Sequence, residues 1–141
     1  MNYKTFFNYC LKISSEITFQ NKSYLEYHAL RFYQTFKVCR KLLENNKSIL
    51  SIGAGSAYVE AVLSRELNLS VTLVDFPEAI KANKSYYDQK NFKYVSADLS
   101  SDDVNLKIDP IDMILSSEII EHIPRPPSSH FLTFEKYLKP G

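Results

Sequence analysis

Four short apolar runs in the chain end in residues that could bind a ligand or move protons. The first run, "SILSI", leads into a glycine turn at residues 53–55, and the later runs lead to Asp75, to Asp98 and to the segment 117–122. Glycines let a ligand approach the backbone closely, whereas carboxylates accept hydrogen bonds or bind cations. The pattern therefore predicts a ligand site built from the ends of several strands.

The glycine turn is followed at once by an amphipathic, helix-like pattern, as in "ILSIGAGSAYVEAV". A helix N-terminus offers unpaired amides and a partial positive charge, which suit the polar part of a ligand. A dinucleotide site would place a third glycine at position 58, where this chain has Tyr58. No Gly-Lys-Ser/Thr follows, which excludes a P-loop. The turn thus argues against a dinucleotide; the alternative is a strand-to-helix turn with no ligand.

Two aspartates end the next two runs. A carboxylate in the place of Asp75 can accept two hydrogen bonds from a ribose diol, or it can cap the helix expected to begin at Pro77. Asp98 could accept a hydrogen bond from an adenine amino group, or it could cap a turn. Together the two acids favour a compact ligand of the adenosine type.

The fourth run is followed by "SSEIIEHIP", which brings Glu118, Glu121 and His122 within five residues. If residues 118–123 form a helical turn, the three side chains share one face. Two carboxylates and an imidazole on one face could hold Mg²⁺ or Mn²⁺. Without a metal, His122 could act as a general base, since its ordinary pKa lies nearest to neutrality. A polar loop with no chemical role is the third possibility.

Strands that alternate with helices must position these residues. The β-prone runs lie at 48–52, 71–75, 93–97 and 111–117, and the helical patterns lie at about 57–67, 77–89 and 128–138. Such alternation predicts an α/β fold with a parallel sheet. In this class of fold the ligand crevice lies at the carboxyl ends of the strands.

The first 46 residues are expected to be helical. Apolar residues recur there at spacings of four and three, which predicts one buried helix face: Leu25, Ala29, Phe32, Phe36, Cys39 and Leu43. Tyr24, Tyr27, His28 and Tyr33 could form a lid over the ligand, or they could pack on the sheet.

Composition narrows the class of protein. The formal net charge of +1 provides no global basic field for binding nucleic acid, and no apolar run approaches the ~20 residues of a membrane span. The N-terminus lacks the continuous apolar region of a secretory signal. Cys10 and Cys39 fit no metal-binding spacing, so we expect buried free thiols in a cytoplasmic protein.

Residues 47–141 resemble the class I, Rossmann-like, S-adenosylmethionine-dependent methyltransferases. The matching stretches, in order, are "ILSIGAGSA", "VTLVDFPEAI", "YVSADL", "IDMILSSEIIEHI" and "FEKYLKPG". The resemblance implies a four-stranded sheet in the order 3-2-1-4, flanked by helices, with residues 1–46 as a helical cap or lid. It also implies S-adenosylmethionine as cofactor. The resemblance does not fix the methyl acceptor, for which we expect a small molecule, and a homo-oligomer is a further expectation.

The resemblance further implies a role for each matching position. In the family, the acid at Asp75 binds the ribose, the residue at Phe76 stacks near the adenine, and Asp98 meets the adenine amino group. Glu118 and His122 are the expected catalytic residues. The positions implied to contact the cofactor are Ser51, Gly53, Ala54, Gly55, Asp75, Phe76, Asp98, Leu99 and Ser117.

Three departures from the family pattern stand out. Ser51 occupies a position where the family has an acid that helps to fix the ammonium group of the cofactor, and Ala57 replaces a third glycine. The family also continues beyond "LKPGG" with three more strands. The chain is therefore expected to be the N-terminal part of such a domain, and a truncated or inactive cofactor-binding module that acts through a partner is an alternative.

The stretch "EIIEH" also resembles the metal-binding segment of small-RNA 2′-O-methyltransferases and of ubiquinone-pathway O-methyltransferases. That resemblance implies Mg²⁺ bound by Glu118, Glu121 and His122. The RNA enzymes need a further histidine, and His130 does not stand at the matching position. A Mg²⁺-dependent RNA methyltransferase is thus another alternative.

Overall fold

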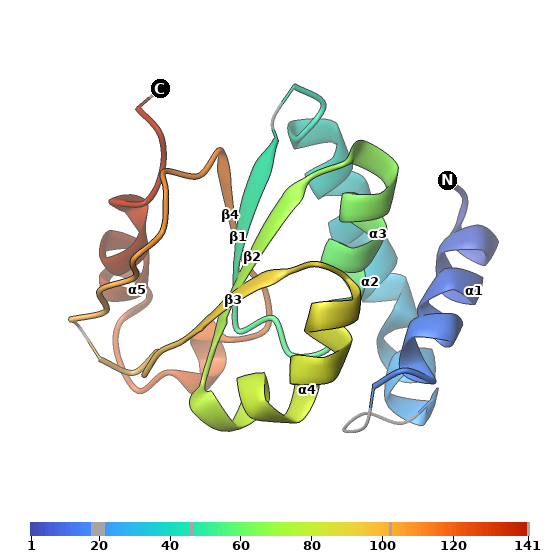
Figure 1. Cartoon of the computed structure of the whole chain (residues 1–141), viewed down its shortest axis with the longest axis horizontal. Helices are drawn as coiled ribbons and strands as arrows, with labels where there is room; N and C mark the ends of the chain where they lie inside the picture. The colour runs from blue at the N-terminus through green and yellow to red at the C-terminus, as the bar shows by residue number, and fades with distance from the viewer. Residues whose placement is uncertain (18–21, 46, 102, 141) are drawn as a thin grey trace.

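The computed structural model describes residues 1–17, 22–45, 47–101 and 103–140. Its centre is a parallel sheet of four strands: β1 (Ser48–Ile52), β2 (Ser70–Asp75), β3 (Lys93–Ser96) and β4 (Met113–Ser116). The strands lie in the order β3-β2-β1-β4, so the predicted α/β fold and the predicted order are confirmed (Figure 1).

The strand register aligns the carboxyl ends of all four strands. Ile52 at the end of β1 lies beside Val74 of β2 and Ser116 of β4, while Asp75 lies beside Ser96 of β3. The glycine turn, Asp75 and the loops after β3 and β4 therefore meet at one edge of the sheet. This is the edge at which open α/β sheets bind their ligands.

Helices cover both faces of this sheet. The elements are α1 (Tyr3–Ser14), α2 (Lys22–Leu42), α3 (Tyr58–Leu67), α4 (Pro77–Gln89), the 3-10 turn η1 (Ile120–His122) and α5 (Pro127–Glu135). Helices α1 to α4 lie on one side of the sheet and α5 lies on the other (Figure 1). Proline occupies the first position of α4, as predicted, because its fixed φ suits a helix start.

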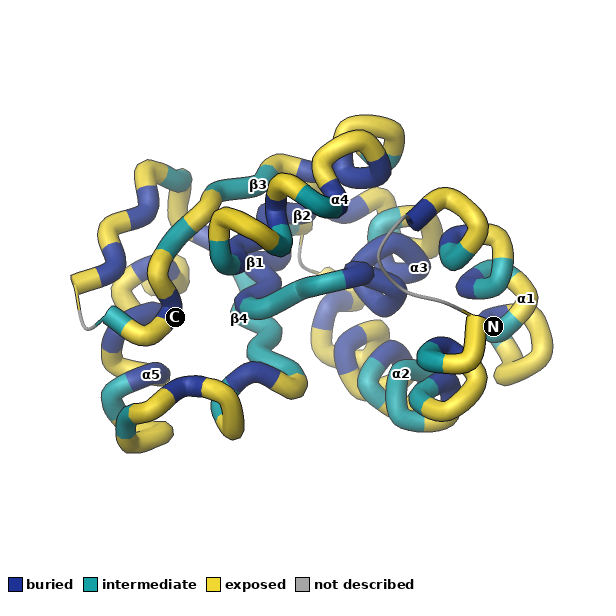
Figure 2. Tube along the Cα trace, turned by 90° about the horizontal axis from the view of Figure 1, so that it is seen from below, coloured by how far each residue is buried: buried dark blue, intermediate teal, exposed yellow. Residues whose placement is uncertain are grey.

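Each face of the sheet contributes to a separate core. Ile49 and Leu73 belong to the core beneath α1 to α4, whereas Leu50 and Val74 belong to the core beneath α5. Successive side chains of a strand point to opposite faces, so this alternation follows from the strand geometry. Ser51 has the parity of Ile49 and therefore points toward the side of α3. The strands β1 and β2 are buried along most of their length (Figure 2).

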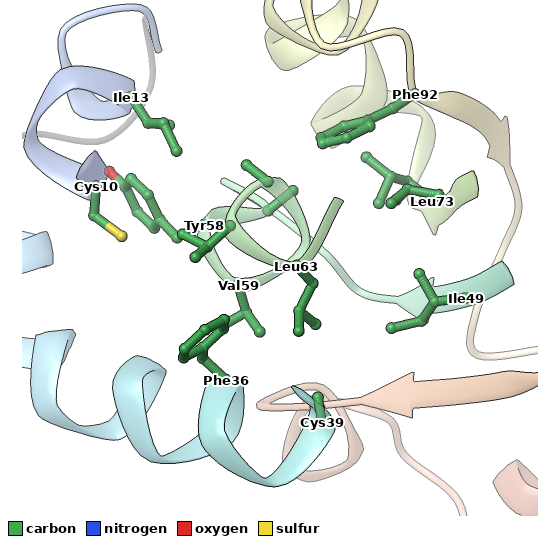
Figure 3. Close-up of a cluster of buried hydrophobic side chains, with 14 of the residues drawn as sticks. Cys10, Ile13, Phe36, Cys39, Ile49, Tyr58, Val59, Leu63, Leu73 and Phe92 are labelled. Atoms are coloured by element: carbon green, nitrogen blue, oxygen red, sulfur yellow. The ribbon is translucent and has the colours of Figure 1, made fainter. Parts of the chain in front are cut away.

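The predicted apolar face of α2 is confirmed. Five of its six expected positions are buried and Phe32 is half-buried. Figure 3 shows Tyr58 of α3 reaching toward Cys10 and Ile13 of α1. Cys10 and Cys39 are free thiols and both are buried. The N-terminal helices thus share one core with the sheet through α3.

At the opposite edge of the sheet, Asp112 fixes β4 beside β1. One of its carboxylate oxygens accepts hydrogen bonds from the backbone N–H groups of Lys47 (3.0 Å) and Ser48 (2.9 Å), and the other pairs with Lys139 (2.6 Å). Lys139 and these hydrogen bonds hold the pKa of Asp112 well below its usual range.

None of the helices in the described segments has the length and apolarity needed to cross a bilayer.

Candidate functional site

A cavity of about 210 Å³ lies beside the glycine turn at the carboxyl edge of the sheet. Its walls come from the turn itself, from Ser51 of β1, Glu60 of α3, Tyr24 of α2 and Ser117 after β4. A larger hollow of about 990 Å³ lies at the amino edge of the sheet and is lined by several lysines. Parallel α/β sheets bind their ligands at the carboxyl edge, so the smaller cavity is the better candidate site.

The two glycines of the turn have different surroundings. Both have positive φ, +68° at Gly53 and +50° at Gly55, which favours glycine. A Cβ atom at Gly53 would lie only 2.6 Å from the side chain of Ile119, which folds over the turn from the segment after β4. A Cβ atom at Gly55 would meet nothing within 4 Å. Only the open side of Gly55 leaves a ligand direct access to the backbone.

Asp75 holds this turn in place. Its carboxylate accepts hydrogen bonds from the backbone N–H groups of Gly55 (2.9 Å) and Phe76 (2.8 Å). It does not cap α4, because the N-cap residue is Phe76 and no side chain caps that helix. Burial raises the pKa of Asp75, and the two backbone hydrogen bonds oppose this shift. Each carboxylate oxygen keeps a lone pair, so Asp75 can still accept two further hydrogen bonds.

The segment after β3 presents fewer groups to a ligand. Asp98 is exposed and accepts a hydrogen bond from the backbone N–H of Ser100 (2.9 Å), and it also binds the Ser100 hydroxyl. Asp98 therefore caps a turn through Oδ1, and an adenine contact through its other carboxylate oxygen stays a prediction. The side chain of Leu99 lies wholly in the α5-side core, so only its backbone is available to a ligand.

The segment after β4 does not form the helical turn that a metal site required. Glu118 has a φ of +60°, and the 3-10 turn begins only at Ile120, so Glu118 does not share a helix face with Glu121 and His122. The Glu118 carboxylate instead pairs with Arg31 of α2 at 2.7 Å. Within the described residues, no group of three His, Cys, Asp or Glu side chains could hold a metal ion. The described residues therefore give no support to the predicted Mg²⁺ site at Glu118, Glu121 and His122.

Helix α2 covers one side of the cavity. Tyr24 and Phe32 lie in its wall, and the ion pair between Arg31 and Glu118 ties α2 to the segment after β4. Tyr33 packs on the rings of Phe6 and Phe36 instead, in the core. A lid role for α2 stays a prediction: of the residues expected to form it, Tyr24 lies in the cavity wall, whereas Tyr33 packs elsewhere. Arg31 was not expected from the sequence, because no local pattern pairs it with Glu118.

Glu60 is the second residue of the site that the sequence did not reveal. It is the third residue of α3, it is 5% exposed, and its carboxylate accepts a hydrogen bond from the hydroxyl of Ser51 (2.5 Å). Burial raises the pKa of Glu60, while the bonds from Ser51 and from its own backbone N–H oppose this shift. Its one local signal is an acid inside the apolar stretch "YVEAVL", all of which is buried.

Residues 23–141 match the family model described as "Methyltransferase domain". No curated protein matches the chain. Three solved structures illustrate the likeness in fold. A candidate sarcosine dimethylglycine methyltransferase from Galdieria sulphuraria superposes with a TM-score of 0.65 at 20% identity, over 82% of this chain and 46% of that one.

A candidate methyltransferase from Haloferax volcanii, solved with the Trm112 methyltransferase activator, has a TM-score of 0.65 at 21% identity, over 85% of this chain and 54% of that one. Human N-acetylserotonin methyltransferase, solved with S-adenosylmethionine, has a TM-score of 0.63 at 13% identity, over 85% of this chain and 34% of that one. The chain thus spans about half of these proteins or less. At such identities the likeness shows a shared Rossmann-like α/β fold.

Proposed function

Because this chain belongs to the methyltransferase-domain family, which its residues 23–141 match, we propose that it binds S-adenosylmethionine and transfers a methyl group to a small molecule. One observation carries the proposal: the open backbone at Gly55 is held by a carboxylate, Asp75, that keeps two acceptor sites. A ribose diol carries two O–H donors of the kind that these carboxylate oxygens accept. The two buried free thiols suit a reducing compartment, so we place the protein in the cytoplasm.

The size of the cavity suggests which part of the cofactor would lie inside it and which part would lie outside. A volume of about 210 Å³ is smaller than the ~300–1,000 Å³ of pockets that enclose a whole ligand. It suits the amino-acid end of S-adenosylmethionine, with the adenosine outside it along the loops after β2 and β3. Asp75 would then accept from the ribose hydroxyls, the half-buried Phe76 would lie against the adenine, and Asp98 would face the adenine amino group.

The chemistry needs mainly alignment. When bound, S-adenosylmethionine supplies an electrophilic methyl group and its sulfonium leaves as a neutral thioether. The chain must therefore hold the acceptor in line with the methyl group and keep water away. Ser117 and Glu118 border the cavity where the acceptor would enter. Glu118 is the proposed proton acceptor, and its ion pair with Arg31 must open before it can take a proton. His122 is exposed, and a catalytic role for it stays a prediction.

Isothermal titration calorimetry tests the cofactor directly. We expect heat of binding with S-adenosylmethionine and S-adenosylhomocysteine, and none with NAD, because Tyr58 fills the position of a third glycine. An Asp75→Ala variant is expected to lose binding, while Lys93→Ala, at the opposite edge of the sheet, serves as the control. Absence of heat at millimolar S-adenosylhomocysteine would reject the proposal, and binding of NAD would favour an oxidoreductase.

A second candidate is a cofactor-binding module that needs a partner for turnover. The Haloferax volcanii neighbour was solved with a methyltransferase activator. In the described sheet, β4 is bonded to β1 on one side and forms the edge on the other, so it offers a strand to a partner. Methyl transfer by the chain alone over a panel of acceptors would favour the first candidate. Cofactor binding without any turnover would favour the second.

A further inference from the structure

The carboxylate of Glu60 is a buried charge with no cation beside it. It lies in the wall of the cavity and is 5% exposed. Among the described residues, no Lys, Arg or His side chain forms an ion pair with it. Its hydrogen-bond donors are the hydroxyl of Ser51 and its own backbone N–H. Buried carboxylates in proteins are ordinarily paired with a cation or bound to a metal, so this one calls for an explanation.

Three of the groups near Glu60 are a thiol and two phenols, which carry no positive charge to pair with it. Cys39 on α2 and Tyr86 and Tyr87 on α4 feel the negative charge of Glu60, which contributes to raising their pKa values. Ser51 faces it from β1. Burial raises the pKa of Glu60 itself, and the hydrogen bonds from Ser51 and from its own backbone N–H oppose this shift without the help of an ion pair in the described part of the chain. The site is therefore an under-compensated anion at the wall of a cavity.

A purely structural role explains this arrangement poorly. An acid in the first turn of a helix is stabilised by the helix dipole. That stabilisation needs no burial and therefore no cost of desolvation, and Glu78 occupies such an exposed position in the first turn of α4. Glu60 instead carries the cost of burial and reaches back to β1. A buried polar group kept at such a cost is typical of a binding site.

We propose that Glu60 is the receptor for the α-ammonium group of the cofactor, supplying from α3 the carboxylate that Ser51 lacks on β1. This inference rests on the proposed function. The ammonium group donates up to three hydrogen bonds, and Glu60 lines a cavity of about 210 Å³ that is open to such a group. The sulfonium has no N–H to donate, so the ammonium is the better partner. Ser51 acts as a positioning residue, because its hydroxyl orients the Glu60 carboxylate.

Two ligands separate the ammonium contact from the rest of the site. S-adenosylhomocysteine carries the α-ammonium group, whereas 5′-deoxy-5′-methylthioadenosine keeps the adenosine and the thioether but lacks the amino acid. Charged hydrogen bonds contribute roughly 1.5–3 kcal/mol, which corresponds to an affinity change of about 10- to 150-fold. We expect Glu60→Gln to weaken S-adenosylhomocysteine by that factor and to leave methylthioadenosine within about twofold of the wild type.

Controls distinguish this inference from the proposed function. Glu66→Gln, an exposed acid on the same helix, is expected to leave both affinities unchanged. If the wild type binds neither ligand, the proposed function and the role of Glu60 both fall. If the wild type binds S-adenosylhomocysteine and Glu60→Gln binds it equally well, the role of Glu60 is overturned and the proposed function stands.

Thermal unfolding without ligand provides an independent readout. Removing an uncompensated buried charge should leave the midpoint of Glu60→Gln equal to or above that of the wild type at pH 8. A lower midpoint together with equal loss of both ligands would mean that Glu60 only shapes the turn. Should Glu60→Gln fail to fold, Ser51→Ala tests the same contact. It is expected to weaken S-adenosylhomocysteine several-fold and to spare methylthioadenosine, and equal losses for both ligands would overturn the proposal.

Discussion

Alanine substitution at Gly53 should mainly reduce the stability of the fold, whereas alanine substitution at Gly55 should mainly block the approach of a ligand. Both positions hold a positive φ, so a Cβ atom costs about 1–2 kcal/mol at either one. At Gly53 the new atom would also lie 2.7 Å from the Cβ of Ile119. A change of rotamer cannot move that atom, because it is fixed to the Ile119 backbone, so the segment after β4 must shift. At Gly55 the new atom would enter open space.

The free energies follow from these surroundings. Overpacking costs roughly 1–3 kcal/mol, and replacing glycine restricts the unfolded chain by about 0.5–1 kcal/mol, which opposes the loss. Gly53→Ala should therefore lower the free energy of unfolding by about 2–4 kcal/mol. Gly55→Ala should lower it by only about 1 kcal/mol. Urea unfolding followed by circular dichroism measures both values.

Ligand affinity should change in the opposite order. Gly55→Ala places a methyl group where the ligand approaches the backbone, so we expect the affinity for S-adenosylhomocysteine to fall about tenfold or more, as for a clash of about 1.4 kcal/mol. Under conditions in which it is folded, Gly53→Ala should bind more tightly than Gly55→Ala. Equal losses of stability in the two variants, or unchanged affinity in Gly55→Ala, would refute this division of roles.

Three further predictions follow from buried groups. Asp75→Asn should lower the free energy of unfolding by about 1–3 kcal/mol in urea titrations, because its amide N–H₂ would face the N–H of Gly55 or Phe76. Burial raises the pKa of Cys10 to about 12 and that of Cys39 to about 11, so a thiol reagent at pH 8 should react slowly with the folded chain and rapidly in urea. The raised pKa of Glu60 means that its contribution to stability is present in acid and is lost as the pH rises through the folded-state pKa. The difference in thermal unfolding midpoint between Glu60→Gln and the wild type at pH 8 should therefore shrink toward pH 4. A difference that does not depend on pH would contradict burial of the Glu60 charge as its cause.

The sheet was predictable because its signals are local. Short β-prone runs, separated by helical patterns that begin at residues such as Pro77, define the alternation of strands and helices. Right-handed crossovers then leave few arrangements for a parallel sheet. The observed order and the meeting of the strand ends at one edge follow from these constraints. The position of the candidate site at the carboxyl edge of the sheet could be predicted from the sequence for the same reason.

The details of the site depend on contacts between distant residues. The hydroxyl of Ser51 reaches Glu60 on the next helix, and Arg31 reaches Glu118 from a different part of the chain. Neither pairing has a local signature. The helical turn expected at 118–123 failed because Glu118 adopts a left-handed conformation, which spacing does not reveal. A single such residue removed the shared face on which the metal prediction depended.

The amide resonances of the chain, recorded with and without saturating S-adenosylhomocysteine, show whether the glycine turn holds the cofactor. We expect the largest shifts at the carboxyl edge of the sheet, at Gly55, Glu60 and Phe76, while Lys93 and Lys107 at the opposite edge stay unchanged. Glu66, exposed on α3, serves as an internal reference. Shifts confined to the lysine-lined edge, or no shifts at millimolar ligand, would contradict the assignment of the glycine turn as the cofactor site.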